Sequence, residues 1–372
     1  MSVLNSQNQR TNDEEEIYFN FINSIKSETT KRVYDRDLKF YLNFCGLNKM
    51  SGLLEIEDPQ RQIINYIMYL RKRGLASNSV STMLMGIYHF YEMNDVPLNK
   101  KKINMFKGEF SRKVIDRAYT DKEIKKLLDV SDLRMKSVIL LMASSGTRIG
   151  AIPGLKIRNL EKIDSIYKIA VYEGTNEQYY TFCTPECAYY IDAYFLYRTN
   201  NGEKIQKDSY LIRDQFDITD IEQVRNRSKG VALNTLRTMM NNNLIKAGLK
   251  TVDSTGYNRK EVALAHGLRK FFMTQLTNLK INPEIREMLL GHKIGLASCY
   301  YRPTQEEMLK EYEKGIDSLT INEENRLRRE LEQKIQIEKS QFEALKEDFD
   351  KLKKEVMNQR NQRLTSVRNS NL

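Results

Sequence analysis

The segment 289–301, which reads Leu-Leu-Gly-His-Lys-Ile-Gly-Leu-Ala-Ser-Cys-Tyr-Tyr, constrains the rest of the chain more than any other. It is predicted to begin as the end of a helix, with Asn282 as the N-cap, Pro283 in the first turn and Gly291 as the stop. A histidine follows that stop, and two tyrosines lie a short distance beyond it. An imidazole and a phenol so placed can serve one phosphate, because the imidazole binds an oxygen or moves a proton while the phenol attacks phosphorus.

Two further segments carry residues that suit the same chemistry. In the segment 144–149, Ser-Ser-Gly-Thr-Arg-Ile, Arg148 follows a glycine turn after an apolar helix. His266 and Arg269 are three positions apart and therefore share one face of a helix. An arginine presents bidentate donors to phosphate oxygens, a geometry that lysine does not reproduce. Each residue alone has an ordinary structural explanation, but two of the chain's three histidines belong to this set.

Together these residues resemble the tyrosine recombinase, or phage-integrase, family. The resemblance rests on their order, which is an arginine, a hairpin lysine, His-x-x-Arg, Leu-Gly-His and a nucleophilic tyrosine about nine positions later. Counting from His292, this pattern selects Tyr301 over Tyr300. The resemblance covers roughly residues 14–305 and implies that a set of catalytic residues converges on one phosphate: Arg148, His266, Arg269, His292 and Tyr301.

One part of the family pattern is missing from this chain. The resemblance implies a lysine in the turn of a β-hairpin, where it protonates the leaving oxygen, but the turn at 173–176 reads Glu-Gly-Thr-Asn. Lys168, on the strand before the turn, is the nearest candidate, although the alternation of a strand can point it away. The resemblance implies no metal and no other cofactor.

The rest of the sequence predicts a mainly α-helical fold with a small antiparallel β-sheet. Residues 14–98 carry apolar residues at three- and four-residue steps, which predicts a helical domain. The resemblance identifies it as the core-binding, SAM-like DNA-binding domain. Residues 99–117 are rich in lysine and arginine and predict a basic linker. A capping-box pattern at Thr120 opens an α+β catalytic domain over 118–315, with a hairpin within 165–182.

The two ends of the chain have a different character. Residues 1–13 predict a disordered tail. Residues 322–363 place apolar residues at alternating a and d heptad positions, with Glu338 as the misfit, and predict a C-terminal coiled-coil helix. A solitary charged helix is the alternative. We expect this segment to promote self-association or to recruit another protein through its heptad residues, Leu331, Ile335, Phe342, Leu345, Phe349, Leu352 and Val356.

The charge balance favours a polyanionic partner. The chain has 60 Lys and Arg against 49 Asp and Glu, a net charge of +11, which suits nucleic acid or an anionic membrane surface. No apolar run approaches the roughly 18 residues of a spanning helix, and the polar, acidic N-terminus does not resemble a signal peptide. We therefore expect a cytoplasmic, nucleoid-associated protein. Its scattered cysteines are expected to be reduced thiols rather than metal ligands: Cys45, Cys183, Cys187 and Cys299.

These observations predict a site-specific DNA recombinase or integrase that cleaves and rejoins strands through a 3′-phosphotyrosyl intermediate. Its partner would be double-stranded DNA, and the resemblance implies a homotetramer on that DNA. Two alternatives stay open. One is a type IB topoisomerase, which relaxes supercoils as a monomer. The other is a DNA-binding relative with impaired catalysis, a reading that the missing turn lysine suggests.

Overall fold

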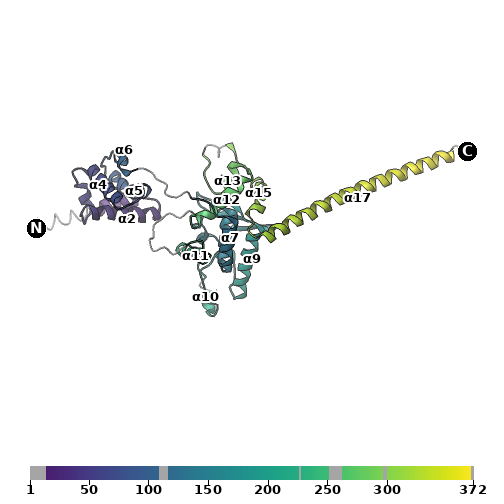
Figure 1. The fold of residues 1–372 in the computed structure, drawn as a ribbon, viewed down its shortest axis with the longest axis horizontal. Helices are drawn as coiled ribbons and strands as arrows, with labels where there is room; N and C mark the ends of the chain where they lie inside the picture. Colours follow the sequence, from purple (N-terminus) through teal and green to yellow (C-terminus); the bar gives the residue numbers. More distant parts are fainter. Residues whose placement is uncertain (1–13, 109–115, 226–227, 251–261, 296–299, 370–372) are drawn as a thin grey trace. The chain divides into compact units, whose positions relative to one another are not determined.

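The protein divides into two compact units, one ending at Lys113 and one beginning at Val114. Each unit has its own buried apolar core. Helices dominate both units, and a three-stranded antiparallel sheet lies in the second, so the predicted mainly α fold with a small sheet is confirmed (Figure 1). The structure, a computed structural model, describes residues 14–108, 116–225, 228–250, 262–295 and 300–369.

The first unit is a helical bundle in which two helices cross closely. A β-carbon added at Gly86 would lie 2.9 Å from the backbone of Tyr34, so the glycine permits this approach. Residues 14–23 are also helical. The other elements of the unit are α2 (Glu28–Phe44), α3 (Ser51–Leu54), α4 (Pro59–Lys72), α5 (Ser77–Met93), α6 (Lys100–Asn104) and the 3-10 helix η1 (Met105–Lys107).

Part of the segment that the sequence predicted to be a linker is ordered within this unit. Both α6 and η1 fall inside residues 99–117. The Asn99 side chain caps α6 by accepting the Lys102 N–H at 3.0 Å, and Ile103 is fully buried in the core of the unit. The lysines of α6 and η1 therefore lie on packed helical turns rather than on an extended chain.

The second unit is built around α8 (Leu133–Ser145), an apolar helix that is buried along almost its whole length. Both α9 and α12 pack against α8. The capping box predicted from the sequence is present, because the Thr120 hydroxyl accepts the Glu123 N–H at 3.3 Å and the Glu123 carboxylate accepts the Thr120 N–H at 2.8 Å. The remaining helices are α7 (Asp121–Asp129), η2 (Ile152–Gly154), η3 (Ile157–Asn159), α9 (Pro185–Asn200), α10 (Ile221–Arg225), α11 (Leu233–Lys246), α12 (His266–Asn278), α13 (Pro283–Leu289), α15 (Gln305–Glu313) and α16 (Ile316–Leu319).

The sheet has the strand order β1-β2-β3, with β1 at Leu160–Ile163, β2 at Ile166–Val171 and β3 at Tyr179–Phe182. The predicted hairpin is β2-β3, in which Val171 pairs with Tyr179. Strand β1 is an addition to the prediction. Since β3 contacts both α13 and α15, the turn between β2 and β3 lies near the end of α13, where the His292 segment begins.

The predicted coiled-coil segment forms one continuous helix, α17 (Glu323–Asn369) (Figure 1). The start of this helix is fixed to α9, because the buried Glu186 carboxylate accepts the N–H groups of Ile321 at 2.8 Å and Asn322 at 3.1 Å. Pairing of α17 with a second helix remains a prediction. Among the described residues, no helix combines the length and apolar character needed to cross a membrane.

Candidate active site

Arg148 is positioned by the end of α8. The helix stops at Gly146, whose φ of 66° lies in the left-handed region that favours glycine. A β-carbon at Gly146 would lie 2.5 Å from Leu290 and 2.6 Å from Phe272, so the ends of α8 and α13 and the middle of α12 meet here. Two residues further on, the Arg148 side chain is exposed.

Arg269 joins the same three helices by hydrogen bonds. It is only 4% exposed. Its Nη1 donates to the Gly146 carbonyl and its Nη2 to the Leu290 carbonyl, both at 2.6 Å. Burial lowers the pKa of the Arg269 guanidinium, and the charge of Arg148 lowers it further. The two guanidinium groups therefore repel each other, which an anion bound between them would relieve.

His292 lies just beyond α13 and is held on both ring nitrogens. Asn282 caps this helix as predicted, accepting the Glu284 N–H at 2.9 Å. The Nη2 of Arg269 lies 2.8 Å from Nε2 of His292, and Nδ1 lies 2.5 Å from a carboxylate oxygen of Glu287. A guanidinium can only donate, so Nε2 is the acceptor and Nδ1 carries the proton that it donates to Glu287. This pairing fixes the orientation of the ring.

His266 lies at the first position of α12 and is exposed. Burial lowers the pKa of its imidazole, and three nearby groups lower it further: Arg269, Arg148 and His292. Four of the predicted residues thus interact electrostatically at one place. These neighbours favour the neutral form of the imidazole, which can accept a proton at its unprotonated nitrogen.

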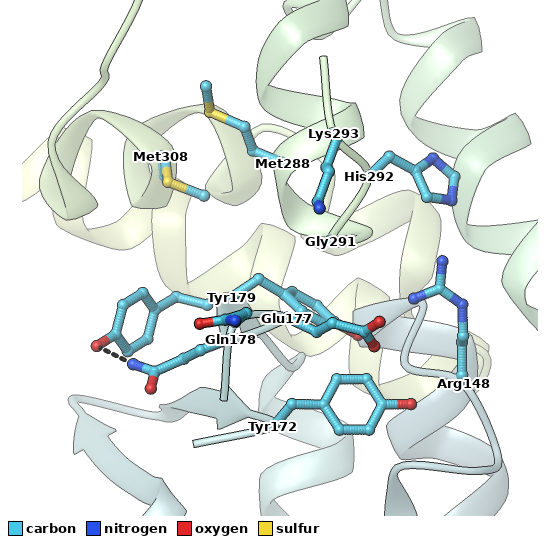
Figure 2. Close-up of a pocket in the computed structure, with 12 residues that line it drawn as sticks. Arg148, Tyr172, Glu177, Gln178, Tyr179, Met288, Gly291, His292, Lys293 and Met308 are labelled. Carbon is cyan, nitrogen blue, oxygen red and sulfur yellow. Dashed lines mark hydrogen bonds between the residues drawn. The ribbon is translucent and has the colours of Figure 1, made fainter. Parts of the chain in front are cut away.

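A pocket of about 510 Å³ opens beside this cluster (Figure 2). Arg148 and His292 lie on one side of it, and Tyr172, Glu177 and Tyr179, from β3 and the turn before it, lie below (Figure 2). Strand β3 lies close to the segment that follows α13. A β-carbon at Gly291 would lie 2.4 Å from the Tyr179 ring, so the glycine permits this approach. Asn176, Gln178, Tyr180, Met288, Gly291, Lys293 and Met308 complete the lining.

Tyr301 lies outside the residues that line this pocket. Its ring is partly buried and packs against the core of the second unit. Burial raises the pKa of its phenol, and three carboxylates raise it further: Glu307, Glu284 and Glu311. These carboxylates disfavour the phenolate, which is the form of the side chain that would attack phosphorus.

Lys168 is not among the residues that line the pocket. Its ammonium forms an ion pair with Glu161, the residue opposite it on β1, and donates to the Gln305 side chain at 2.9 Å. The same ammonium lies 5.7 Å from the centroid of the Tyr180 ring. Three partners thus hold Lys168 against the sheet and α15.

The sequence reasoning did not identify Glu287, Lys293 or Asn176 at this site. Glu287 precedes His292 by five positions, and its role depends on how the chain folds back after α13. Lys293 follows His292 directly, so its place beside the site could have been predicted from the sequence. Among the described residues, no group of three or more His, Cys, Asp or Glu side chains is arranged to hold a metal ion.

The sequence also matches a family profile. Residues 117–307, about half of the chain, match the phage integrase family. The chain belongs to this family. As a phage-integrase family member it is a tyrosine recombinase, an enzyme of the class that cleaves and rejoins DNA strands, and the resemblance drawn from Arg148, His266, Arg269 and the Leu-Gly-His segment is confirmed.

Similar proteins agree with this assignment to the phage integrase family. The chain is 24% identical over 311 residues to tyrosine recombinase XerC of Leptospira interrogans serogroup Icterohaemorrhagiae serovar copenhageni (strain Fiocruz L1-130), covering 78% of this chain and 89% of that protein. The Tn1549 transposon integrase in complex with a circular intermediate DNA has a similar fold, with a TM-score of 0.56, 14% identity, and coverage of 80% of this chain and 98% of that one.

A second solved structure also shares the fold of this integrase-family chain. It is a lambda integrase dimer bound to a COC′ core site, with a TM-score of 0.52 and 15% identity. The match covers 77% of this chain and 94% of that one. At such identities the similarity of both solved structures concerns the fold.

Proposed function

We propose that this tyrosine recombinase acts at specific DNA sites through a 3′-phosphotyrosyl intermediate formed on Tyr301. The observation that carries the proposal is the convergence of two guanidinium and two imidazole groups beside one pocket, although Arg148 and His266 are more than a hundred residues apart in the chain. Such a cluster suits one phosphodiester, whose non-bridging oxygens carry the charge that the arginines match.

Each of these side chains has one role in the cleavage reaction. Arg148 and Arg269 hold the non-bridging oxygens and stabilise the charge of the transition state. His266, whose neutral form its surroundings favour, accepts the proton of the attacking phenol. The Tyr301 oxygen displaces the 5′ oxygen and stays bonded to the 3′ phosphate, which keeps the energy for rejoining. To do this, Tyr301 has to leave its carboxylate neighbours and approach the pocket.

Double-stranded DNA is the proposed partner of both units. The net charge of +11 supports it, and so do the DNA complexes of similarly folded integrases. We assign unit 1 to the core-binding role, with the basic residues of 99–117 as phosphate contacts, and the second unit to catalysis. A homotetramer on paired DNA sites, and a location at the nucleoid, follow from this proposal.

An exchange assay on supercoiled DNA distinguishes recombination from simple relaxation. Given a plasmid with two copies of a binding site selected from randomised duplexes, the chain is expected to produce recombined circles that gel electrophoresis resolves. Relaxed circles with no exchange would instead support a type IB topoisomerase. Binding without any change in DNA topology or connectivity would support the DNA-binding relative with impaired catalysis.

We further propose that α17 pairs with a second copy of itself. Six of its heptad residues are 43–68% exposed in the single chain: Leu331, Ile335, Phe342, Leu345, Phe349 and Leu352. Exposing these apolar side chains to water is unfavourable, and pairing with a second helix would cover them. In a parallel pair Asp348 of one helix would face Lys353 of the other, while Lys334 would face Lys339, so these charges do not set the direction of pairing.

A double substitution tests this pairing. Phe342→Glu with Leu345→Glu places charges in the seam and is expected to lower the molar mass in solution, measured by light scattering, to that of a monomer. Glu343→Gln, on the outer face, is the matched control and should keep the native mass. Equal masses for the native chain and the double variant would contradict the proposal that α17 drives self-association.

A further inference from the structure

The cleavage step proposed for this site lacks an assigned proton donor. When the bond from phosphorus to the 5′ oxygen breaks, that oxygen receives an electron pair and needs a proton. The turn between β2 and β3, residues 172–178, contains no lysine. Lys168 is held by Glu161 and by Gln305. The inference below rests on the proposed strand-cleavage function and concerns which side chain supplies this proton.

Lys293 is the lysine that lines the pocket. In Figure 2 its side chain extends into the pocket from the segment after α13, toward the hairpin residues and across from Arg148. Within the described ranges, no hydrogen bond or ion pair engages its ammonium group, which is exposed. Its backbone is held in place by its neighbours, because Gly291 packs on Tyr179 and His292 is bound on both nitrogens.

The other cations at the site are poorly suited to give up a proton. A guanidinium does not deprotonate in proteins, which excludes Arg148 and Arg269 as acids. His292 donates its one ring proton to Glu287. Burial and the positive charges around His266 lower its pKa, and the cleavage step already assigns it the role of accepting the phenolic proton. Lys293 is thus the charged donor that remains in the pocket.

We propose that Lys293 is the general acid that protonates the 5′-oxygen leaving group. A bond forms between the Tyr301 oxygen and phosphorus, and the phenolic proton passes to His266. The bond from phosphorus to the 5′ oxygen breaks, its electron pair stays on that oxygen, and the Lys293 ammonium donates a proton to it. The reverse transfers accompany rejoining, in which the 5′ hydroxyl attacks and Lys293 recovers its proton.

A substrate with a better leaving group tests this role directly. The probe is a duplex selected from randomised DNA by binding to the Tyr301→Phe chain, made with either oxygen or sulfur at the 5′ bridging position of the scissile phosphate. A thiolate leaves without protonation, because its pKa is far below that of an alcohol. Lys293→Ala is expected to cleave the oxygen duplex ~10²–10⁴-fold more slowly than the native chain, but to cleave the sulfur duplex at close to the native rate.

Two further variants test whether Lys293 acts by donating a proton. Lys293→Arg tests whether its positive charge alone is enough, and Lys168→Ala tests whether Lys168 is the acid instead. Lys293→Arg keeps the charge but not a transferable proton, so it is expected to show the same sulfur-rescued defect as Lys293→Ala. The proposal would be overturned if Lys293→Ala lost the same factor on both duplexes, or if it cleaved the oxygen duplex at the native rate. It would also be overturned if only Lys168→Ala showed a defect that sulfur rescues. If the native chain forms no adduct with either duplex, the proposed cleavage function fails instead, and the assignment with it.

Discussion

Tyr301→Phe is expected to form no covalent adduct with DNA while binding the duplex with close to native affinity. Phenylalanine keeps the ring that packs against the core but removes the oxygen that would bond to phosphorus. A selected duplex with a nick near the cleaved phosphate traps the adduct of the native chain, because the short cleaved strand diffuses away before it can be rejoined. Denaturing gels then show the adduct as a slowly migrating band.

The adjacent tyrosine provides a matched control for this substitution. Tyr300 is 90% exposed, carries the same functional group and follows Ser298 and Cys299 in the same segment. Tyr300→Phe is expected to form the adduct at the native level. An adduct that survives Tyr301→Phe and disappears in Tyr300→Phe would show that the pattern of spacing from His292 selected the wrong nucleophile.

The second large effect is expected when either Arg148 or Arg269 is replaced. Both substitutions should slow cleavage, but only the loss of Arg269 should also lower stability. Removing one charged donor from a transition state typically costs 10²–10³-fold in rate, so Arg148→Ala is expected to slow adduct formation by about this factor. Because the Arg148 side chain is exposed, its loss should leave the thermal midpoint close to native. Single-turnover cleavage and differential scanning fluorimetry measure the two quantities.

Arg269→Ala is expected to lower both the rate and the stability. Arg269 is buried and bonded to the carbonyls of Gly146 and Leu290, and a buried polar group left without its partner costs about 1–3 kcal/mol. Arg269→Lys retains a charge but not the fork that reaches both carbonyls and the phosphate. Unchanged cleavage in Arg148→Ala, or equal stability of the two alanine variants, would contradict the roles given to these arginines.

Much of the site follows from local sequence signals. The Asn282 cap, the stop at Gly291 and the glycine turn before Arg148 are decided by neighbouring residues, and each is present as predicted. The spacing of His266 and Arg269 on one helix face is likewise a local property. The family pattern supplied what these signals lack, namely that the segments meet.

The features that the sequence did not reveal depend on distant contacts. Strand β1 has four residues and alternates poorly, so it is recognisable only beside β2. The carboxylates around Tyr301 come from two helices, Glu284 from α13 and Glu307 and Glu311 from α15, and their meeting at one ring depends on how these helices pack. The ion pair that binds Lys168 arises from the strand register that places Glu161 opposite it, which is why alternation alone left that lysine undecided.

The most direct test of the account is a structure of the Tyr301→Phe chain bound to its selected duplex. We predict that Arg148 and Arg269 both donate to one phosphate, with His266 and His292 beside it and the ring of residue 301 moved from its carboxylate neighbours to face that phosphorus. A complex in which these four side chains contact different phosphates, or none, would contradict the claim that they form a single site for strand cleavage.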